Sequence, residues 1–153
     1  MRAGSKVLAV LAAGCTAVLM IGIRVHADAP PGHFTDLGDG TVRDNATGLI
    51  WQQGFSPSEL PQAECVAYCT TLTTSGGGWR LPSLLELCSI VDETRSDPAI
   101  DLSVFPGTPM ASSFWSSSPV PGRPFYGWYV DHFDGDPSFA YGSGVPRRAR
   151  CVR

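Results

Sequence analysis

The stretch GGGWRLPSLLELCSIVD, residues 76–92, decides how this chain folds. Its three glycines give the backbone the freedom to turn, and Pro82 keeps Leu81 out of helical conformation, so no helix begins earlier. Ser83 and Glu86 then form a Ser-x-x-Glu capping box, in which each side chain binds a free backbone N–H at the helix start. An apolar stripe follows at helical spacing: Leu84, Leu87, Cys88 and Val91. The stretch therefore predicts a turn and then a helix whose cysteine faces another helix.

The first 27 residues have the features of a secretory signal peptide. A basic start precedes an apolar run over residues 7–23, and small residues surround a cleavage position after Ala27 or Ala29. The sequence also leaves open an uncleaved membrane anchor over the same run and a lipoprotein attached at Cys15. We interpret residues 1–27 as a signal peptide, so we expect the mature chain in the periplasm, on the cell surface or secreted.

The mature chain divides into a short linker, residues 28–33, and one domain, residues 34–153. Removal of residues 1–27 takes three of the 11 basic residues and none of the 14 acidic ones, which leaves a net charge of −6. This charge argues against a nucleic-acid partner, because binding to phosphates needs lysine and arginine. Four arginines gather near the C-terminus, where we expect them to point into solvent from a strand: Arg147, Arg148, Arg150 and Arg153.

Turn residues and apolar spacing predict the elements of the first half. Residues 41–43 and 49–51 are predicted to form two short strands, and the Asn-x-x-Gly sequence between them tolerates the backbone conformations of a hairpin turn. Residues 61–72 are predicted to form a helix, since Pro61 suits a first helical turn. One face of this helix is apolar and turns both cysteines toward the core: Cys65, Val66, Cys69 and Leu72.

The second half is predicted to be a long loop followed by strands. Residues 97–125 are rich in proline and serine and therefore resist regular structure, apart from a short strand candidate at residues 114–118. Residues 126–133, 138–141 and 148–152 are predicted to be strands. Together these elements predict an α+β domain in which two helices flank antiparallel sheets.

Four cysteines remain in the mature chain, and an even number in an exported chain indicates disulfides. A zinc site would normally bring two close pairs, whereas only Cys65 and Cys69 are close in this sequence. A bond between these two would lie within one helical turn, where the side-chain directions suit it poorly. We prefer Cys65–Cys88, which would join the two predicted helices, together with Cys69–Cys151, which would tie the first helix to the final strand.

A series of short motifs runs through residues 34–153: Gly38-Asp39-Gly40-Thr41-Val42-Arg43-Asp44, Thr47-Gly48-Leu49-Ile50-Trp51, Ala67-Tyr68-Cys69, Trp79-Arg80-Leu81-Pro82, Glu86-Leu87, Ile90-Val91-Asp92, Pro98-Ala99-Ile100-Asp101, Phe114-Trp115-Ser116-Ser117-Ser118 and Arg150-Cys151-Val152-Arg153. In this order they resemble the Lcl C-terminal domain family. The resemblance implies a C-type-lectin-like fold, in which the chain ends pair as adjacent strands. It also implies the Cys69–Cys151 bond. Cys65 and Cys88 are not part of the family's common pattern, which fits an added second disulfide.

The resemblance implies binding rather than catalysis. The family comes mostly from exported bacterial proteins, and the member that names it is a surface adhesin whose domain binds sulfated polysaccharide. We therefore predict a non-catalytic binding module with its ligand site on residues 103–125, for a surface glycan or a cell-surface protein, and with no membrane contact after signal cleavage. Two alternatives stay open: an enzyme or accessory of the formylglycine-generating oxidase type, which needs two reactive cysteines, and a structural component of the envelope. The sequence does not predict an oligomeric state.

Aromatic rings and carboxylates near that loop are the candidate ligand-binding residues, because exposed rings can stack on sugar faces. They are Tyr126, Tyr129, Asp131, Asp134 and Asp136. The aspartates raise calcium as an alternative, but their spacing does not match a calcium-binding loop, and Asp134-Gly135 suits a hairpin turn. We otherwise expect no metal or cofactor.

The remaining aromatic and histidine residues are predicted to be structural. We expect Trp115 and Trp128 in the core of the sheet. His33 and His132 do not lie in a nucleophile–base–acid arrangement, so neither indicates an active site.

Overall fold

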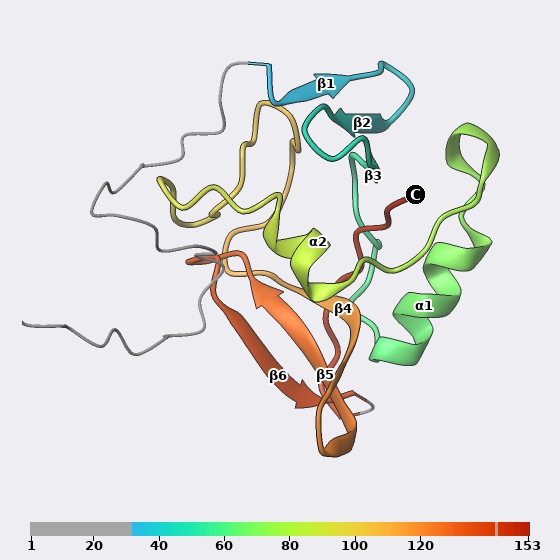
Figure 1. The fold of residues 1–153 in the computed structure, drawn as a ribbon, viewed down its shortest axis with the longest axis vertical. Coiled ribbons are helices and arrows are strands. Elements are labelled where there is room, and N and C mark those ends of the chain that lie inside the picture. Colours follow the sequence, from blue (N-terminus) through green and yellow to red (C-terminus); the bar gives the residue numbers. More distant parts are fainter. Residues whose placement is uncertain (1–31, 143) are drawn as a thin grey trace, which may run out of the picture.

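The computed structural model describes residues 32–142 and 144–153, so the predicted signal peptide, its alternatives and residues 28–31 of the linker lie outside the described residues (Figure 1). The elements are β1 (Phe34–Asp36), β2 (Thr41–Asp44), β3 (Ile50–Gln52), α1 (Gln62–Thr71), a 3₁₀ turn (Thr74–Gly76), α2 (Leu84–Cys88), β4 (Ser113–Val120), β5 (Arg123–Asp131) and β6 (Pro137–Tyr141). They form two helices and two small antiparallel sheets, which confirms the α+β class. Within this part of the chain, no helix has both the length and the apolar character needed to span a bilayer.

The first sheet has the order β1-β2-β3. Val42 of β2 pairs with Trp51 of β3, and both side chains are buried. Asp44 Oδ1 accepts the backbone N–H of Ala46 at 2.9 Å, and Gly48 has a left-handed φ of 78°. The predicted hairpin is therefore confirmed, together with its turn chemistry. β1 adds a third strand that the sequence did not predict.

The second sheet has the order β4-β5-β6, and the strands predicted over residues 126–133 and 138–141 are confirmed as β5 and β6. The strand candidate at residues 114–118 is confirmed as part of β4. The loop predicted around it over residues 97–125 is too long, because β4 continues through Pro119 to Val120 and β5 begins at Arg123. Proline has no N–H to donate, and the β4–β5 register shifts on both sides of Pro119, so the strand accommodates it at an irregularity. The irregular segment is limited to the chain between α2 and β4.

Both predicted helices form, and α2 begins as its sequence indicates. Ser83 Oγ accepts the N–H of Glu86 at 3.3 Å, and Glu86 Oε2 accepts the N–H of Ser83 at 2.8 Å, which completes the capping box. Two hydrogen bonds from the Arg80 guanidinium lower the pKa of Glu86 to about 2. α1 turns Cys65 toward the core as predicted, but Val66 is exposed rather than part of the buried face.

The C-terminal segment, residues 147–153, crosses the middle of the molecule between the two sheets (Figure 1). On one side the N–H of Gln52 in β3 donates to the C=O of Cys151 at 2.8 Å. On the other side the N–H of Trp115 in β4 donates to the C=O of Arg148 at 3.0 Å. These contacts are isolated bridges, so the predicted final strand is a connector rather than a member of either sheet. Its neighbour is β3, the second strand of the hairpin, and not β1 at the N-terminal edge.

The four arginines of this segment do not point into solvent as predicted. Arg150 is buried, and its guanidinium donates to the C=O of Gln53 at 2.8 Å and to Oγ1 of Thr108 at 2.7 Å. The same guanidinium lies 4.6 Å from the centre of the Phe105 ring. Because elements enclose the segment on both sides, aromatic faces replace water around the Arg150 cation, whereas the other three arginines are half-buried. The other three also lie over rings: Arg147 over Trp115 and Tyr129, Arg148 over Phe55, and Arg153 over Trp79.

One predicted disulfide is confirmed and the other is wrong. Cys69 of α1 is bonded to Cys151, with the two Cα atoms 5.4 Å apart. Cys65 is a free, buried thiol, so the predicted Cys65–Cys88 bond does not form. The reason is the orientation of the helices. Cys65 packs in the core cluster around the Cys69–Cys151 bond, whereas Cys88 packs against the other cluster, around Trp51.

Candidate ligand-binding surface

The predicted ligand-binding residues lie on β5 and on the turn after it, and they do not form one site. Tyr126 and Asp131 are five residues apart on one strand, which separates them by roughly 16 Å. The aspartates serve the β5–β6 turn: Asp131 Oδ1 accepts the N–H of Phe133 at 3.0 Å, and Asp134 Oδ1 accepts the N–H of Asp136 at 3.1 Å. Among residues 32–142 and 144–153, no group of three or more acidic, histidine or cysteine side chains is arranged to hold a metal ion.

Tyr129 faces the opposite side of β5 from Tyr126, as strand alternation requires. Its ring lies edge-on to Trp115, with ring centres 5.8 Å apart, and the Arg147 guanidinium lies over it at 3.5 Å. Trp115 is fully buried, as predicted, but Trp128 is only half-buried. Tyr129 therefore belongs to the core beside the C-terminal segment, and Tyr126 is the one predicted ring that lies on an exposed aromatic cluster.

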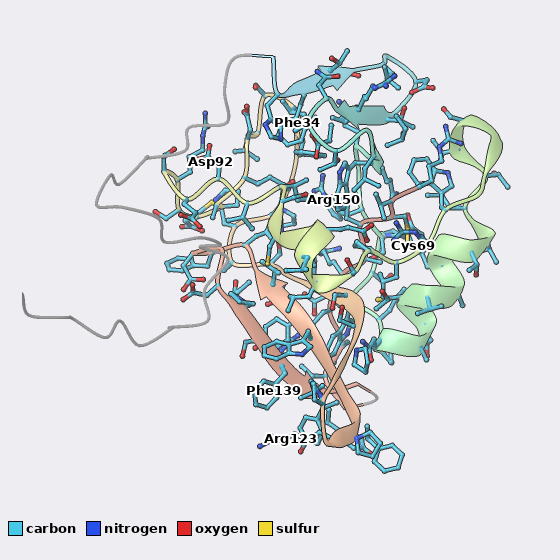
Figure 2. All side chains as sticks on the ribbon, viewed as in Figure 1. Phe34, Cys69, Asp92, Arg123, Phe139 and Arg150 are labelled. Carbon is cyan, nitrogen blue, oxygen red and sulfur yellow. A yellow bond between two sulfur atoms is a disulfide. The ribbon has the colours of Figure 1, made fainter. Side chains whose placement is uncertain are left out.

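That cluster lies where β5 begins and β6 ends, in the region where Figure 2 labels Phe139. Four aromatic side chains are exposed there: Phe125 by 69%, Tyr126 by 36%, Phe139 by 38% and Tyr141 by 44%. Tyr126 and Tyr141 are cross-strand partners with ring centres 5.6 Å apart, and Tyr126 lies 6.3 Å from Phe139. Phe125 contacts Tyr141 at 6.2 Å. Contiguous exposed rings of this kind mark interaction sites on proteins.

Arg123, at the start of β5, adds a positive charge to this cluster. Its guanidinium lies 4.8 Å from the centre of the Phe139 ring and 5.5 Å from that of Tyr126. The side chain is exposed, and no carboxylate in the described part of the chain lies within ion-pair distance of it. An anionic group of a ligand therefore meets no competing carboxylate. We call Arg123, Phe125, Tyr126, Phe139 and Tyr141 the aromatic surface.

A groove of about 370 Å³ adjoins the aromatic surface, between the start of α1 and the β4–β5 hairpin. It is a shallow opening walled by the helix on one side and by strand residues on the other. Its lining residues are Pro61, Gln62, Ala63, Val66, Ser117, Pro119, Pro124, Phe125, Tyr126, Tyr141 and Gly142. Three of them belong to the aromatic surface, so rings and groove form one continuous area.

Gln62 fixes the helical wall of the groove. Its backbone N–H donates to the C=O of Gly142 at 2.9 Å, and its side-chain Nε2 donates to the C=O of Ser116 at 2.7 Å. The amide lies over Gly127 and Gly142, where a side chain would collide with it; a Cβ at Gly142 would lie 2.8 Å from Gln62 Oε1. The two glycines therefore let α1 approach the sheet closely enough to form the groove.

Sequence reasoning found Tyr126 but missed the rest of this area. A signal was present: the predicted turn between residues 126–133 and 138–141 sets a register in which Tyr126 faces Tyr141. Phe139 then lies two residues away on the same face of the sheet. The wall from α1 had no comparable signal, because Val66 falls on the predicted buried face of its helix.

A cluster that contains His132 and Arg150 is enclosed in the core. His132 is buried, and neither of its ring nitrogens has a hydrogen-bond partner among the described residues. Its ring lies 4.7 Å from Phe114, and the Arg150 guanidinium lies over the same phenylalanine at 5.4 Å. Burial, together with the charge of Arg150, lowers the pKa of His132 to about 3, and burial lowers the pKa of Arg150 to about 9. His132 is therefore neutral at physiological pH, and we assign this cluster a structural role.

The cysteines offer little for thiol chemistry in the described part of the chain. Cys69 and Cys151 are bonded to one another. Burial raises the pKa of the Cys65 thiol to about 12, with a smaller effect from Glu64, and its Sγ lies 3.6 Å from the carbonyl oxygens of Leu60 and Arg147. A thiol with this pKa holds its proton and is a poor nucleophile.

One known protein family matches nearly all of this architecture. A family model of the Lcl C-terminal domain matches residues 40–153, which include the β2–β3 hairpin, both helices, the second sheet and the Cys69–Cys151 bond. Comparison with curated proteins and with solved structures found no match. The chain belongs to the Lcl C-terminal domain family.

Proposed function

We propose that this chain is a non-catalytic binding module that acts outside the cytoplasm and holds a glycan or protein of the cell surface on its aromatic surface. The observation that carries the proposal is the exposure of four neighbouring rings beside an arginine that has no carboxylate partner among the described residues. Tyrosine and arginine are the residues that most often contribute large binding energies at interfaces. Rings also bring large contact areas with few rotatable bonds, so little conformational entropy is lost when they are covered.

The placement outside the cytoplasm rests on the disulfide and on the predicted signal peptide. Cys69–Cys151 joins residues 82 positions apart, and such bonds persist mainly in oxidising compartments. The C-type-lectin-like fold is part of the same proposal. It is supported by the bond between the first helix and the C-terminal segment and by the pairing of that segment with β3.

The enzyme alternative has less support from the geometry. An oxidase of the formylglycine-generating type needs two reactive cysteines, whereas Cys65 is buried and its pKa is raised to about 12. Binding measurements test the other alternative, a structural role in the envelope. A purely structural component has no ligand for the aromatic surface to hold.

The test is a glycan array and an array of cell-surface proteins, each probed with the purified exported protein and with a Phe139→Ser/Tyr141→Ser variant. We expect the variant to lose roughly tenfold or more in apparent affinity for any ligand that the parent binds. Phe133→Ser is the matched control, because Phe133 is 48% exposed at the opposite end of the same pair of strands. Equal binding by the double variant, or no binding to either array, would contradict the proposal.

A further inference from the structure

We infer that the groove takes an extended, proline-rich peptide segment that carries a carboxylate. The inference rests on the proposed function, because the groove shares three of its rings with the aromatic surface, and it narrows that function to one class of ligand. Segments of this kind adopt the polyproline II conformation and bind shallow grooves lined by aromatic rings.

The composition of the groove lining favours a proline-rich segment over a sugar. None of the lining side chains carries a charge, and the walls are formed largely by proline, alanine, valine and aromatic rings. A sugar ring presents a hydroxyl group at most of its carbon atoms, and each needs a partner when it is covered. A groove with so few polar side chains would leave many of these hydroxyls unpaired. Pyrrolidine rings, in contrast, need only apolar and aromatic contact.

The hydrogen-bond donors of the lining residues match the acceptors of a proline-rich segment. A proline-rich segment has free carbonyl oxygens and few N–H groups, so its binding site must supply donors. Tyr126 and Tyr141 line the groove, and their hydroxyls make no hydrogen bond within the described part of the chain. The Gln62 amide already donates to Ser116 and holds the wall in place. Two tyrosine donors along an apolar groove therefore suit the carbonyls of such a segment.

The charge of Arg123 favours a segment that carries a carboxylate. Arg123 lies over Tyr126, which lines the groove; its side chain is exposed and has no carboxylate partner among the described residues. A carboxylate on the bound segment would pair with this guanidinium and fix the direction in which the segment lies. The occupant is therefore an acidic proline-rich segment rather than a basic one.

The test is fluorescence anisotropy with the purified exported protein and a labelled peptide of repeating Asp-Pro-Pro units. We expect binding that weakens roughly tenfold in Tyr141→Ser and less in Tyr141→Phe, which keeps the ring and loses only the hydroxyl. Arg123→Glu should reverse the preference, so that a Lys-Pro-Pro peptide binds better than the Asp-Pro-Pro peptide. Phe133→Ser should bind as the parent does, which separates a local effect from a general loss of folding.

Three results would overturn the inference: no measurable peptide binding, equal binding of an Asp-Ala-Ala peptide, or a loss in Phe133→Ser as large as that in Tyr141→Ser. If no peptide binds while the arrays show a ligand that depends on Phe139 and Tyr141, the peptide inference is wrong and the proposed function stands. If the arrays and the peptides all show no binding, both are wrong.

The chain itself contains a segment of this chemistry, Asp28-Ala29-Pro30-Pro31, outside the described residues. Sedimentation of the exported protein over a range of concentrations distinguishes binding of this segment from a second copy of the chain and binding of a separate partner. We expect a monomer at concentrations where the Asp-Pro-Pro peptide binds. Self-association that the peptide reverses, and that Pro30→Ala/Pro31→Ala abolishes, would assign the groove to a second copy of the chain and contradict the partner assignment.

Discussion

Arginine lies over aromatic rings in two regions of this molecule, and the two regions differ in everything else. Figure 2 places Arg150 in the middle of the protein and Arg123 at the end of the β4–β5 hairpin. Arg150 is fully buried, donates to Gln53 and Thr108, and lies 4.6 Å from the centre of the Phe105 ring. Arg123 lies at a similar 4.8 Å from Phe139, but it is exposed and is not part of an ion pair among the described residues.

Arginine–aromatic contacts therefore support folding in one region and are available for binding in the other. Around Arg150 the rings and two hydrogen bonds replace the water that burial removes, so the cluster holds the C-terminal segment between the two sheets. Around Arg123 the rings remain exposed and no carboxylate of residues 32–142 or 144–153 pairs with the charge, so contacts are left for another molecule. We therefore expect changes at the first cluster to affect the free energy of unfolding and changes at the second to affect binding.

The largest effect is expected from removing the disulfide that ties down the buried cluster. Cys69→Ala/Cys151→Ala frees a loop whose ends are 82 positions apart, which lowers the free energy of unfolding by about 4.5 kcal/mol on the chain-entropy model. Denaturant unfolding of the variant and the parent measures this difference. A Cys65→Ala variant is the control, because its thiol is free and its removal leaves the bond intact. A double variant as stable as the parent would show that the bond does not hold this segment.

Arg150→Ala should lower the free energy of unfolding by about 3 kcal/mol, because it leaves a cavity and removes the donors to Gln53 and Thr108. Arg150→Met fills most of the volume without a charge, and we expect it to retain more stability, since burying a guanidinium carries a desolvation penalty. Thermal unfolding of both variants checks this order. If Arg150→Ala were as stable as the parent, the buried cluster would not support the fold.

His132 should make the fold sensitive to acid. Its pKa is about 3 in the folded protein and about 6.5 in the unfolded chain, so the unfolded chain takes up a proton first as pH falls. The stability lost through this residue begins near pH 6.5, reaches about 3 kcal/mol near pH 4 and stops growing near pH 3. His132→Leu removes this dependence, and its nitrogens have no hydrogen-bond partners among the described residues to lose. Unfolding curves at neutral pH and near pH 4 should therefore show a smaller acid loss in the variant than in the parent. An equal loss would mean that His132 is protonated within the fold.

The smallest effect on stability is expected at the aromatic surface. Arg123→Ala removes a solvated side chain and two exposed cation–π contacts, so the free energy of unfolding should change by about 0.5 kcal/mol or less. The same denaturant experiment as for the disulfide variant gives this value. A loss comparable with that of Arg150→Ala would remove the distinction between the two clusters.

Local chemistry made much of the fold predictable. The capping box at Ser83 placed the start of α2, and the turn residues between β2 and β3 placed the first hairpin. Alternating side chains placed Tyr126 and Tyr129 on opposite faces of β5. Each of these features depends on residues that are close together in the sequence, so short patterns are enough to find them.

Features that depend on how distant segments enclose each other were not predictable in this way. The arginines of residues 147–153 look like solvent-facing strand residues until both sheets surround them. The prediction of a Cys65–Cys88 bond was wrong for the same kind of reason. Helical spacing shows which face of a helix carries a cysteine, but not which part of the core that face meets. In the candidate site, Tyr126 was found from its strand, whereas the wall of the groove needed the position of α1 against two glycines.

We expect the aromatic surface to bind ligand and to contribute little to the stability of the fold. The most direct measurement is a comparison of ligand binding and melting temperature in an Arg123→Ala/Tyr141→Ser variant and the parent. We expect a melting temperature close to that of the parent together with the loss of ligand binding on the glycan, protein and peptide probes. Full binding by the variant, or a large fall in its melting temperature, would contradict it.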